Sequence, residues 1–67
     1  MTQADRLLNY LTEYGPITAL GCWAILGIYR ASDAAYKLRK QGKPVQTTMV
    51  EVKNQFGEVI HVAEYRL

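Results

Sequence analysis

The side chains best suited to bind a charged partner lie in one short segment, residues 30–43. It holds five of the eight Lys and Arg residues against a single carboxylate, Asp33, a balance of +4, whereas residues 1–29 and 44–67 each carry −1. The five cations are Arg30, Lys37, Arg39, Lys40 and Lys43. Ammonium and guanidinium groups donate to phosphate oxygens and to guanine edges. The cluster therefore predicts an anionic partner, and the competing interpretation is a solvated helix face.

Other reactive side chains are too few for a different chemistry. Cys22 is the one cysteine and His61 the one histidine, so neither an internal disulfide nor a zinc site with three or four such ligands can form. Three glutamates near the end of the chain, Glu51, Glu58 and Glu64, have no partner base and no phosphate-cradling glycine loop. We therefore expect no catalytic residue, no metal and no cofactor, and a protein that is not an enzyme.

Apolar spacing and turn residues predict three helices that would position the cationic segment. The first runs from Thr2 to about Tyr14, the second from Thr18 to Leu26, and the third over about residues 30–41. Gly27 permits the positive φ of a tight turn between the second and third helices. The inward side of the third helix follows the i, i+3, i+4, i+7 spacing and consists of Ala31, Ala34, Ala35 and Leu38.

The period changes to two after the third helix. Residues 45–53 and 58–67 are rich in β-branched and aromatic residues, and "NQFG" between them is a turn-forming connection, so a two-stranded hairpin is predicted. The second strand carries apolar residues on both parities, which leaves its register open. The prediction is an α+β fold of three helices and a hairpin, in one domain over residues 1–67.

Composition sets limits on location and core. With 49% hydrophobic and 21% charged residues, the chain is typical of a folded globular domain. Its most apolar run, residues 17–28, is too short for the roughly 20 residues of a membrane helix, and "MTQADR" lacks the layout of a signal peptide. We therefore expect no membrane partner and a location in the cytoplasm. Trp23 and the leucines are expected to form the core, and Cys22 is expected to be either a small buried residue or a thiol on a helix face.

Three short helices with a tight glycine turn, followed by a hairpin, are the layout of a winged helix-turn-helix. The chain resembles the small winged helix-turn-helix domains common in phages and prophages along nearly its whole length. The matching segments are "GPITAL" (15–20), "LGIYR" (26–30), "LRKQGKPV" (38–45), "VEVKNQFG" (50–57) and "VAEYRL" (62–67). The resemblance implies DNA binding, with the hairpin as the wing. Basic wing residues common in the family are absent here at Gln55, Val59, His61 and Glu64.

We therefore interpret the third helix as the element that enters the major groove of double-stranded DNA. The residues predicted to face DNA are Arg30, Ser32, Asp33, Tyr36, Lys37 and Lys40. Arg39 and Lys43 are predicted to contact phosphates. At the wing tip, Lys53, Asn54 and Gln55 are predicted to contact the adjacent backbone or minor groove. The outcome of binding would be control of transcription, recombination or replication.

A second hypothesis is a protein-binding surface on the second helix, which is apolar nearly all round. Outer positions that tend to be Glu or Lys in the resembled family are here Gly21, Ala24 and Ile25. Gly21 costs a helix about 1 kcal/mol relative to alanine, which predicts a close approach by another backbone. Together with Phe56, these residues would form a homodimer seam. Alternatively they would bind a host defence protein, as in a phage-encoded anti-CRISPR or anti-restriction inhibitor.

Overall fold

Helix α1 (Gln3–Glu13) begins at a capping box in the computed structural model, which describes residues 1–67. The Thr2 hydroxyl accepts from the Asp5 amide (3.1 Å), and the Asp5 carboxylate accepts from the Thr2 amide (3.2 Å). Two backbone donors at the start of the chain are thereby satisfied. The i, i+3, i+4, i+7 spacing predicts that α1 packs inward through Ala4, Leu7, Leu8 and Leu11; three of these are buried, and Leu8 is half-buried against the core.

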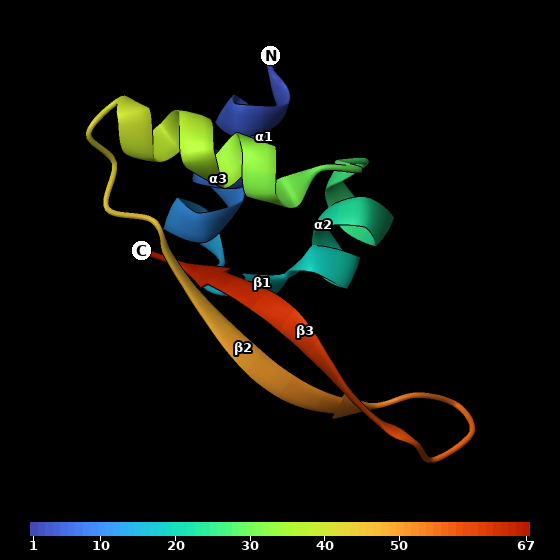
Figure 1. Ribbon diagram of the computed structural model, residues 1–67. Coiled ribbons are helices and arrows are strands. Elements are labelled where there is room, and N and C mark those ends of the chain that lie inside the picture. The colour runs from blue at the N-terminus through green and yellow to red at the C-terminus, as the bar shows by residue number, and fades with distance from the viewer.

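Helices α2 (Ala19–Leu26) and α3 (Ala31–Lys40) are joined by the predicted tight turn. Gly27 has a φ of 67°, in the left-handed region that favours glycine, and the Ile28 amide donates to the Cys22 carbonyl (3.0 Å). The chain therefore starts α3 in a new direction after only a short connection (Figure 1). The predicted inward side of α3 is confirmed as buried and consists of Ala31, Ala34, Ala35 and Leu38.

The sheet has three antiparallel strands, one more than the predicted hairpin. Strands β2 (Gln46–Lys53) and β3 (Val59–Arg66) pair along their whole length, and β1 (Ile17–Thr18) pairs with the other edge of β3. Ile17 lies opposite Tyr65, and both side chains are buried. A strand of two residues shows no alternation, so periodicity could not predict β1.

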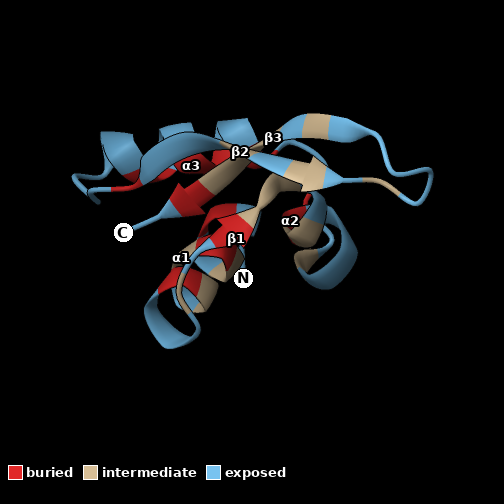
Figure 2. Ribbon diagram, turned by 90° about the horizontal axis from the view of Figure 1, so that it is seen from below, coloured by how far each residue is buried: buried red, intermediate tan, exposed pale blue.

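The core lies where the inner sides of α1 and α3 meet the base of the sheet (Figure 2). Leu7 and Leu38 are fully buried there, as expected. The expectation for two residues of α2 is wrong, because Trp23 is 55% exposed and Leu20 is 54% exposed. This short helix turns Cys22 into the core and packs the half-buried Ala19 and Leu26 against it, which leaves Leu20, Trp23 and Ile25 in solvent.

Gly21 has an explanation inside the molecule, which replaces the predicted approach of a partner backbone. A Cβ added at this position would lie 2.8 Å from Cγ1 of Ile17. Real Cβ atoms do not approach other atoms so closely, so a side chain here would displace the buried Ile17. The glycine lets α2 start close against β1.

The β2–β3 hairpin, called the wing below, projects beyond the helices and lengthens the molecule to 38 Å against 20 Å in the other two directions (Figure 1). Its register, which the sequence left open, sets Val50 opposite Val62 and Val52 opposite Ile60. These β-branched pairs cover one another on one face of the wing. No helix of the protein has the length and apolar character needed to cross a bilayer.

Candidate nucleic-acid interface

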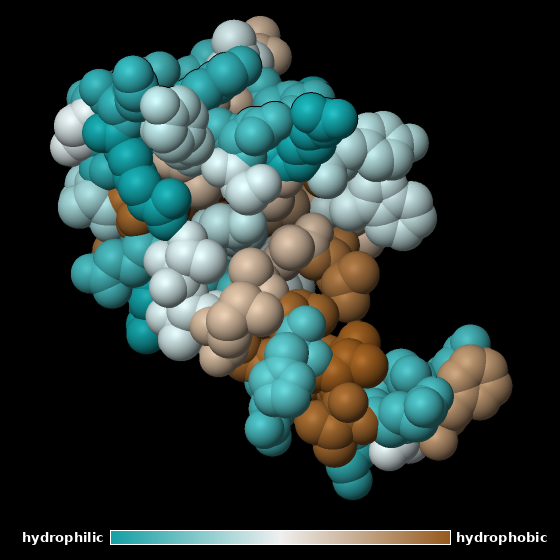
Figure 3. Space-filling model, in the orientation of Figure 1, coloured by the Kyte–Doolittle hydropathy of each residue, from teal (hydrophilic) through white to brown (hydrophobic).

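The outer side of α3 carries polar residues that are all exposed, as the sequence predicts. They are Ser32, Asp33, Tyr36, Lys37 and Lys40. Side chains three and four residues apart share one side of a helix, which places these groups opposite the buried alanines. Hydrophilic residues accordingly gather over α3 in the space-filling view, and hydrophobic ones over the wing below it (Figure 3). Neither Lys37 nor Lys40 is covered by the wing.

Two weak interactions organise this surface. The Lys40 Nζ atom lies 5.5 Å from the centre of the Tyr36 ring, a cation–π contact one turn apart. Arg30 Nη1 lies 3.8 Å from Asp33 Oδ2, with both side chains mostly exposed. Exposed pairs of this kind contribute about 0–1 kcal/mol. The cations therefore stay available to a partner at little cost.

The cationic surface extends past the C-terminal end of α3. Lys37, Arg39 and Lys40 occupy the last turn, where positive charge is favourable beside the free carbonyl groups. Gly42 (φ 84°) turns the chain back, and the Lys43 amide donates to the Leu38 carbonyl (2.9 Å). Lys43 is thereby kept beside the helix end. The positive charge at this end stabilises the helix through its free carbonyl groups and is also exposed to solvent, where a partner can reach it.

Arg39 differs from the other cations because its side chain is engaged within the protein. Its Nε donates to the Val45 carbonyl (2.8 Å), and its Nη2 donates to the Thr47 hydroxyl at the start of β2. Of its three nitrogens, only Nη1 makes no hydrogen bond to the protein. The predicted phosphate contact of Arg39 is therefore left to the two N–H groups of Nη1 and the second N–H group of Nη2, and the sequence pattern did not indicate the link to β2.

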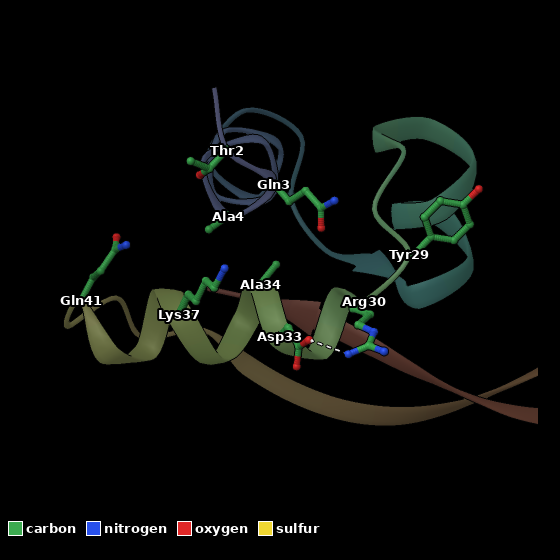
Figure 4. Close-up of a pocket in the computed structure, with 9 residues that line it drawn as sticks. All are labelled: Thr2, Gln3, Ala4, Tyr29, Arg30, Asp33, Ala34, Lys37 and Gln41. Carbon is green, nitrogen blue, oxygen red and sulfur yellow. Dashed lines mark ion pairs between the residues drawn. The ribbon is translucent and has the colours of Figure 1, made fainter.

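A cleft of about 480 Å³ separates the N-terminal end of α1 from α3. Lys37 and Gln41 extend from α3 toward α1 across this space (Figure 4). The cleft is lined by Thr2, Gln3, Ala4, Tyr29, Arg30, Asp33, Ala34, Lys37 and Gln41. Two of these side chains are cationic, four others end in an amide or hydroxyl donor, and Asp33 is the one carboxylate, so the cleft can hydrogen-bond an oxyanion beside the α3 surface.

The wing tip is a hydrogen-bonded turn that carries little positive charge. The Asn54 side-chain oxygen accepts from the amides of Phe56 (2.9 Å) and Glu58 (3.1 Å), so Asn54, one of the predicted DNA contacts, builds the turn. Lys53 and Gln55, the other two, are exposed. Lys53 is the one Lys or Arg between residues 51 and 58, a range that also holds two glutamates. Attraction to phosphates is therefore far weaker here than at α3.

Three of the four residues predicted to form a protein interface are exposed. Ala24 is exposed, Ile25 is 64% exposed and Phe56 is 77% exposed, whereas Gly21 is covered by Ile17. Sequence reasoning missed the exposure of Leu20 and Trp23 beside them. The Trp23 ring centre lies 6.4 Å from that of the exposed Tyr29, an aromatic whose polar tip suits it to an interface or to stacking on DNA. The signal that could have found them is the absence of any Lys, Arg, Asp or Glu between Glu13 and Arg30.

The remaining reactive groups have ordinary structural roles. Cys22 is buried, and desolvation raises the pKa of its thiol, so the nucleophilic thiolate is disfavoured. His61 lies on the exposed surface of the wing with its Nε2 atom 3.3 Å from Glu51 Oε1. No group of three or more His, Cys, Asp or Glu side chains is arranged to hold a metal ion.

Comparison with known proteins adds one finding about the whole chain. A protein-family model described as a winged helix-turn-helix domain matches residues 2–67. No curated protein and no solved structure matches the chain. The matched range includes all three helices and all three strands of the structure.

Proposed function

The chain belongs to the winged helix-turn-helix domain family, and on this premise we propose that it binds double-stranded DNA through α3 and the wing. The observation that carries the proposal is the two-sided character of α3. Its alanine side is buried, whereas its lysine side is exposed on the same helix that the fold places after the tight turn. In this proposal α3 lies in the major groove and the wing lies on the adjacent backbone.

The chemistry of contact follows from the side chains on the exposed side of α3. Lys37 and Lys40 would donate to phosphates or to guanine edges, and Tyr36 would pack against sugar or base with Lys40 held above its ring. Asp33 accepts rather than donates, so it favours a cytosine amino group and repels phosphate. Arg30, paired loosely with Asp33, is placed to balance that repulsion.

The wing has a smaller part in this binding. Its tip offers Lys53 and the amide of Gln55, while Asn54 keeps the turn in shape. Because two glutamates lie nearby, the tip would help to orient the protein on DNA and would add little electrostatic attraction. Most of the affinity would therefore come from α3 and residue Lys43.

A gel shift with random duplex DNA at low salt tests the proposal. Domains of this size bind non-specific DNA with dissociation constants of roughly 10⁻⁴ to 10⁻⁶ M, so a shift is expected below about 100 μM. The double variant K37E/K40E should abolish the shift while circular dichroism shows an unchanged fold. Failure of the unmodified protein to shift any duplex below that concentration would refute DNA binding.

The biological outcome that we propose is control of transcription, recombination or replication in a phage or prophage setting. The resemblance to small phage domains supports this setting, and binding without catalysis is part of the proposal. The protein would act in the cytoplasm of the host cell. Repression of a reporter from a selected binding site would separate transcriptional control from the other two outcomes.

Protein binding is a second candidate function, favoured by the exposed apolar side chains of α2. Leu20, Trp23 and Ile25 are each more than half exposed on one eight-residue helix. Such side chains are characteristic of interfaces, where aromatic residues are enriched. The partner would be a second copy of the chain or a host defence protein that this domain inhibits.

Light scattering distinguishes these partners. A homodimer gives twice the chain mass of 7.6 kDa and becomes a monomer in I25E, whose site of change is already in solvent. A strict monomer at about 100 μM would eliminate the homodimer. Loss of inhibition of a defence nuclease in I25E, with DNA binding retained, would instead support the host protein as the partner.

A further inference from the structure

Arg39 joins the end of α3 to the start of the wing. Its Nε bonds to the carbonyl of Val45, a buried residue, and its Nη2 bonds to the hydroxyl of Thr47 in β2. Thr47 pairs with Tyr65 across the sheet. Burial raises the pKa of the Tyr65 phenol, and the nearby charge of Arg39 opposes that rise, which agrees with a guanidinium lying over the base of the sheet.

The base of β3 is held to the body of the protein by its pairing with β1 and by the buried Tyr65, which shares the core with Leu38 of α3. The backbone of α3, by contrast, packs against α1 and α2 and makes few close approaches to β2. The covalent link is residues 41–45, which include Gly42 at a φ of 84°. A glycine-containing segment of this length can bend, so side-chain hydrogen bonds between α3 and β2 add to the support that the base of β3 receives from β1 and the core. The two hydrogen bonds of Arg39, called the Arg39 brace, span this link.

We propose that Arg39 is a positioning residue whose brace holds the wing at the angle to α3 that lets both elements contact one stretch of DNA. The inference rests on the proposed function. It gives Arg39 a role within the protein in addition to the phosphate contact that the sequence suggests, because the bonds to Val45 and Thr47 use two of the five N–H groups of the guanidinium.

The residue type supports this role. A guanidinium is planar and offers several donors in a fixed fork, so one side chain can satisfy the Val45 carbonyl and the Thr47 hydroxyl together. A lysine keeps the charge but has a single nitrogen on a flexible stem. The variant R39K therefore separates the brace from the charge of Arg39.

The experiment uses R39K and T47V, with T48V as the matched control. Thr47 and Thr48 are adjacent exposed residues of β2, but only the Thr47 hydroxyl accepts from Arg39. The first readout is the orientation and order of the wing relative to α3 in the free protein, from residual dipolar couplings and ¹⁵N relaxation. The second is affinity for random duplex DNA as a function of salt, with thermal melting to verify folding.

The brace predicts that R39K and T47V loosen the wing in the free protein and weaken DNA binding by about two- to tenfold, the range expected for losing one hydrogen bond. The salt dependence should stay the same in both variants because neither loses a charge, and T47V should add nothing to R39K in the double variant. T48V should behave like the unmodified protein. Unchanged wing order in R39K and T47V, or full DNA affinity in T47V, would overturn the inference.

Failure of the proposed function gives a different result. If the unmodified protein binds no duplex, DNA binding by this domain is refuted regardless of the variants. Wing order in the free protein then decides the brace alone: a loosened wing in R39K and T47V supports it as a structural support, and an unchanged wing overturns it.

Discussion

Replacing Lys37 and Lys40 with glutamine should halve the salt dependence of DNA binding. Four cations of the α3 surface are exposed without a close hydrogen bond to the protein: Arg30, Lys37, Lys40 and Lys43. At about −0.9 per phosphate contact, they give a slope of about −3.6 for log affinity against log salt. Affinity should then fall about 150-fold between about 50 mM and about 200 mM salt. With K37Q/K40Q the slope becomes about −1.8, and the same change in salt costs about 12-fold.

Fluorescence anisotropy with a labelled random duplex measures both slopes. The control is R66Q, which also removes one exposed cation. Because neighbouring residues of a strand point to opposite faces and Tyr65 faces the core, Arg66 lies on the sheet face away from the helices. Its slope should stay near that of the unmodified protein. An unchanged slope in K37Q/K40Q, or an equal reduction in R66Q, would refute the assignment of the phosphate contacts to α3.

Three further predictions concern stability. G21A should lower the free energy of unfolding, measured by urea titration, by about 1 kcal/mol, because the added Cβ would collide with Ile17. This clash should outweigh the better helix propensity of alanine. A more stable G21A variant would contradict the close packing of Gly21 against Ile17. L38A should lower the free energy of unfolding by about 2–5 kcal/mol, which is a large share of the total stability of a small domain. A melting temperature near that of the unmodified protein would contradict the full burial of Leu38. Burial raises the pKa of Cys22 above its ordinary 9.0 and that of Tyr65 above 10.0. As the pH rises, these two groups therefore ionise in the unfolded chain before they ionise in the folded protein. The free energy of unfolding should be highest below about pH 9 and should fall as the pH rises further. Urea titrations at about pH 8 and about pH 10.5 test this, and equal stability at both would contradict it.

The parts of the fold that follow from local physics were predictable from the sequence. Gly27 sits where a positive φ is needed, and the alanine spacing of α3 identifies its buried side without any alignment. Once the buried side of α3 is known, helix geometry identifies the residues on the opposite side as exposed. The family and the outer surface of α3 were therefore accessible from residue types and spacing.

The parts that depend on contacts between distant residues were not predictable. Ile17 is a strand residue only because Tyr65 lies opposite it, and Gly21 is required only because Ile17 is there. The exposure of Trp23 depends on how little of α2 the small core can cover. Arg39 looks like any other cation of the α3 surface until the position of Thr47 is known.

The most direct test of the account is chemical-shift mapping of the ¹⁵N-labelled protein during titration with a random DNA duplex. If the exposed side of α3 binds DNA, the largest shifts fall on residues 30–43, with smaller ones at the tip of the wing around Lys53 and Gln55. Shifts confined to α2 and Tyr29, or no shifts at all, would contradict the claim that the exposed side of α3 is the surface that binds DNA.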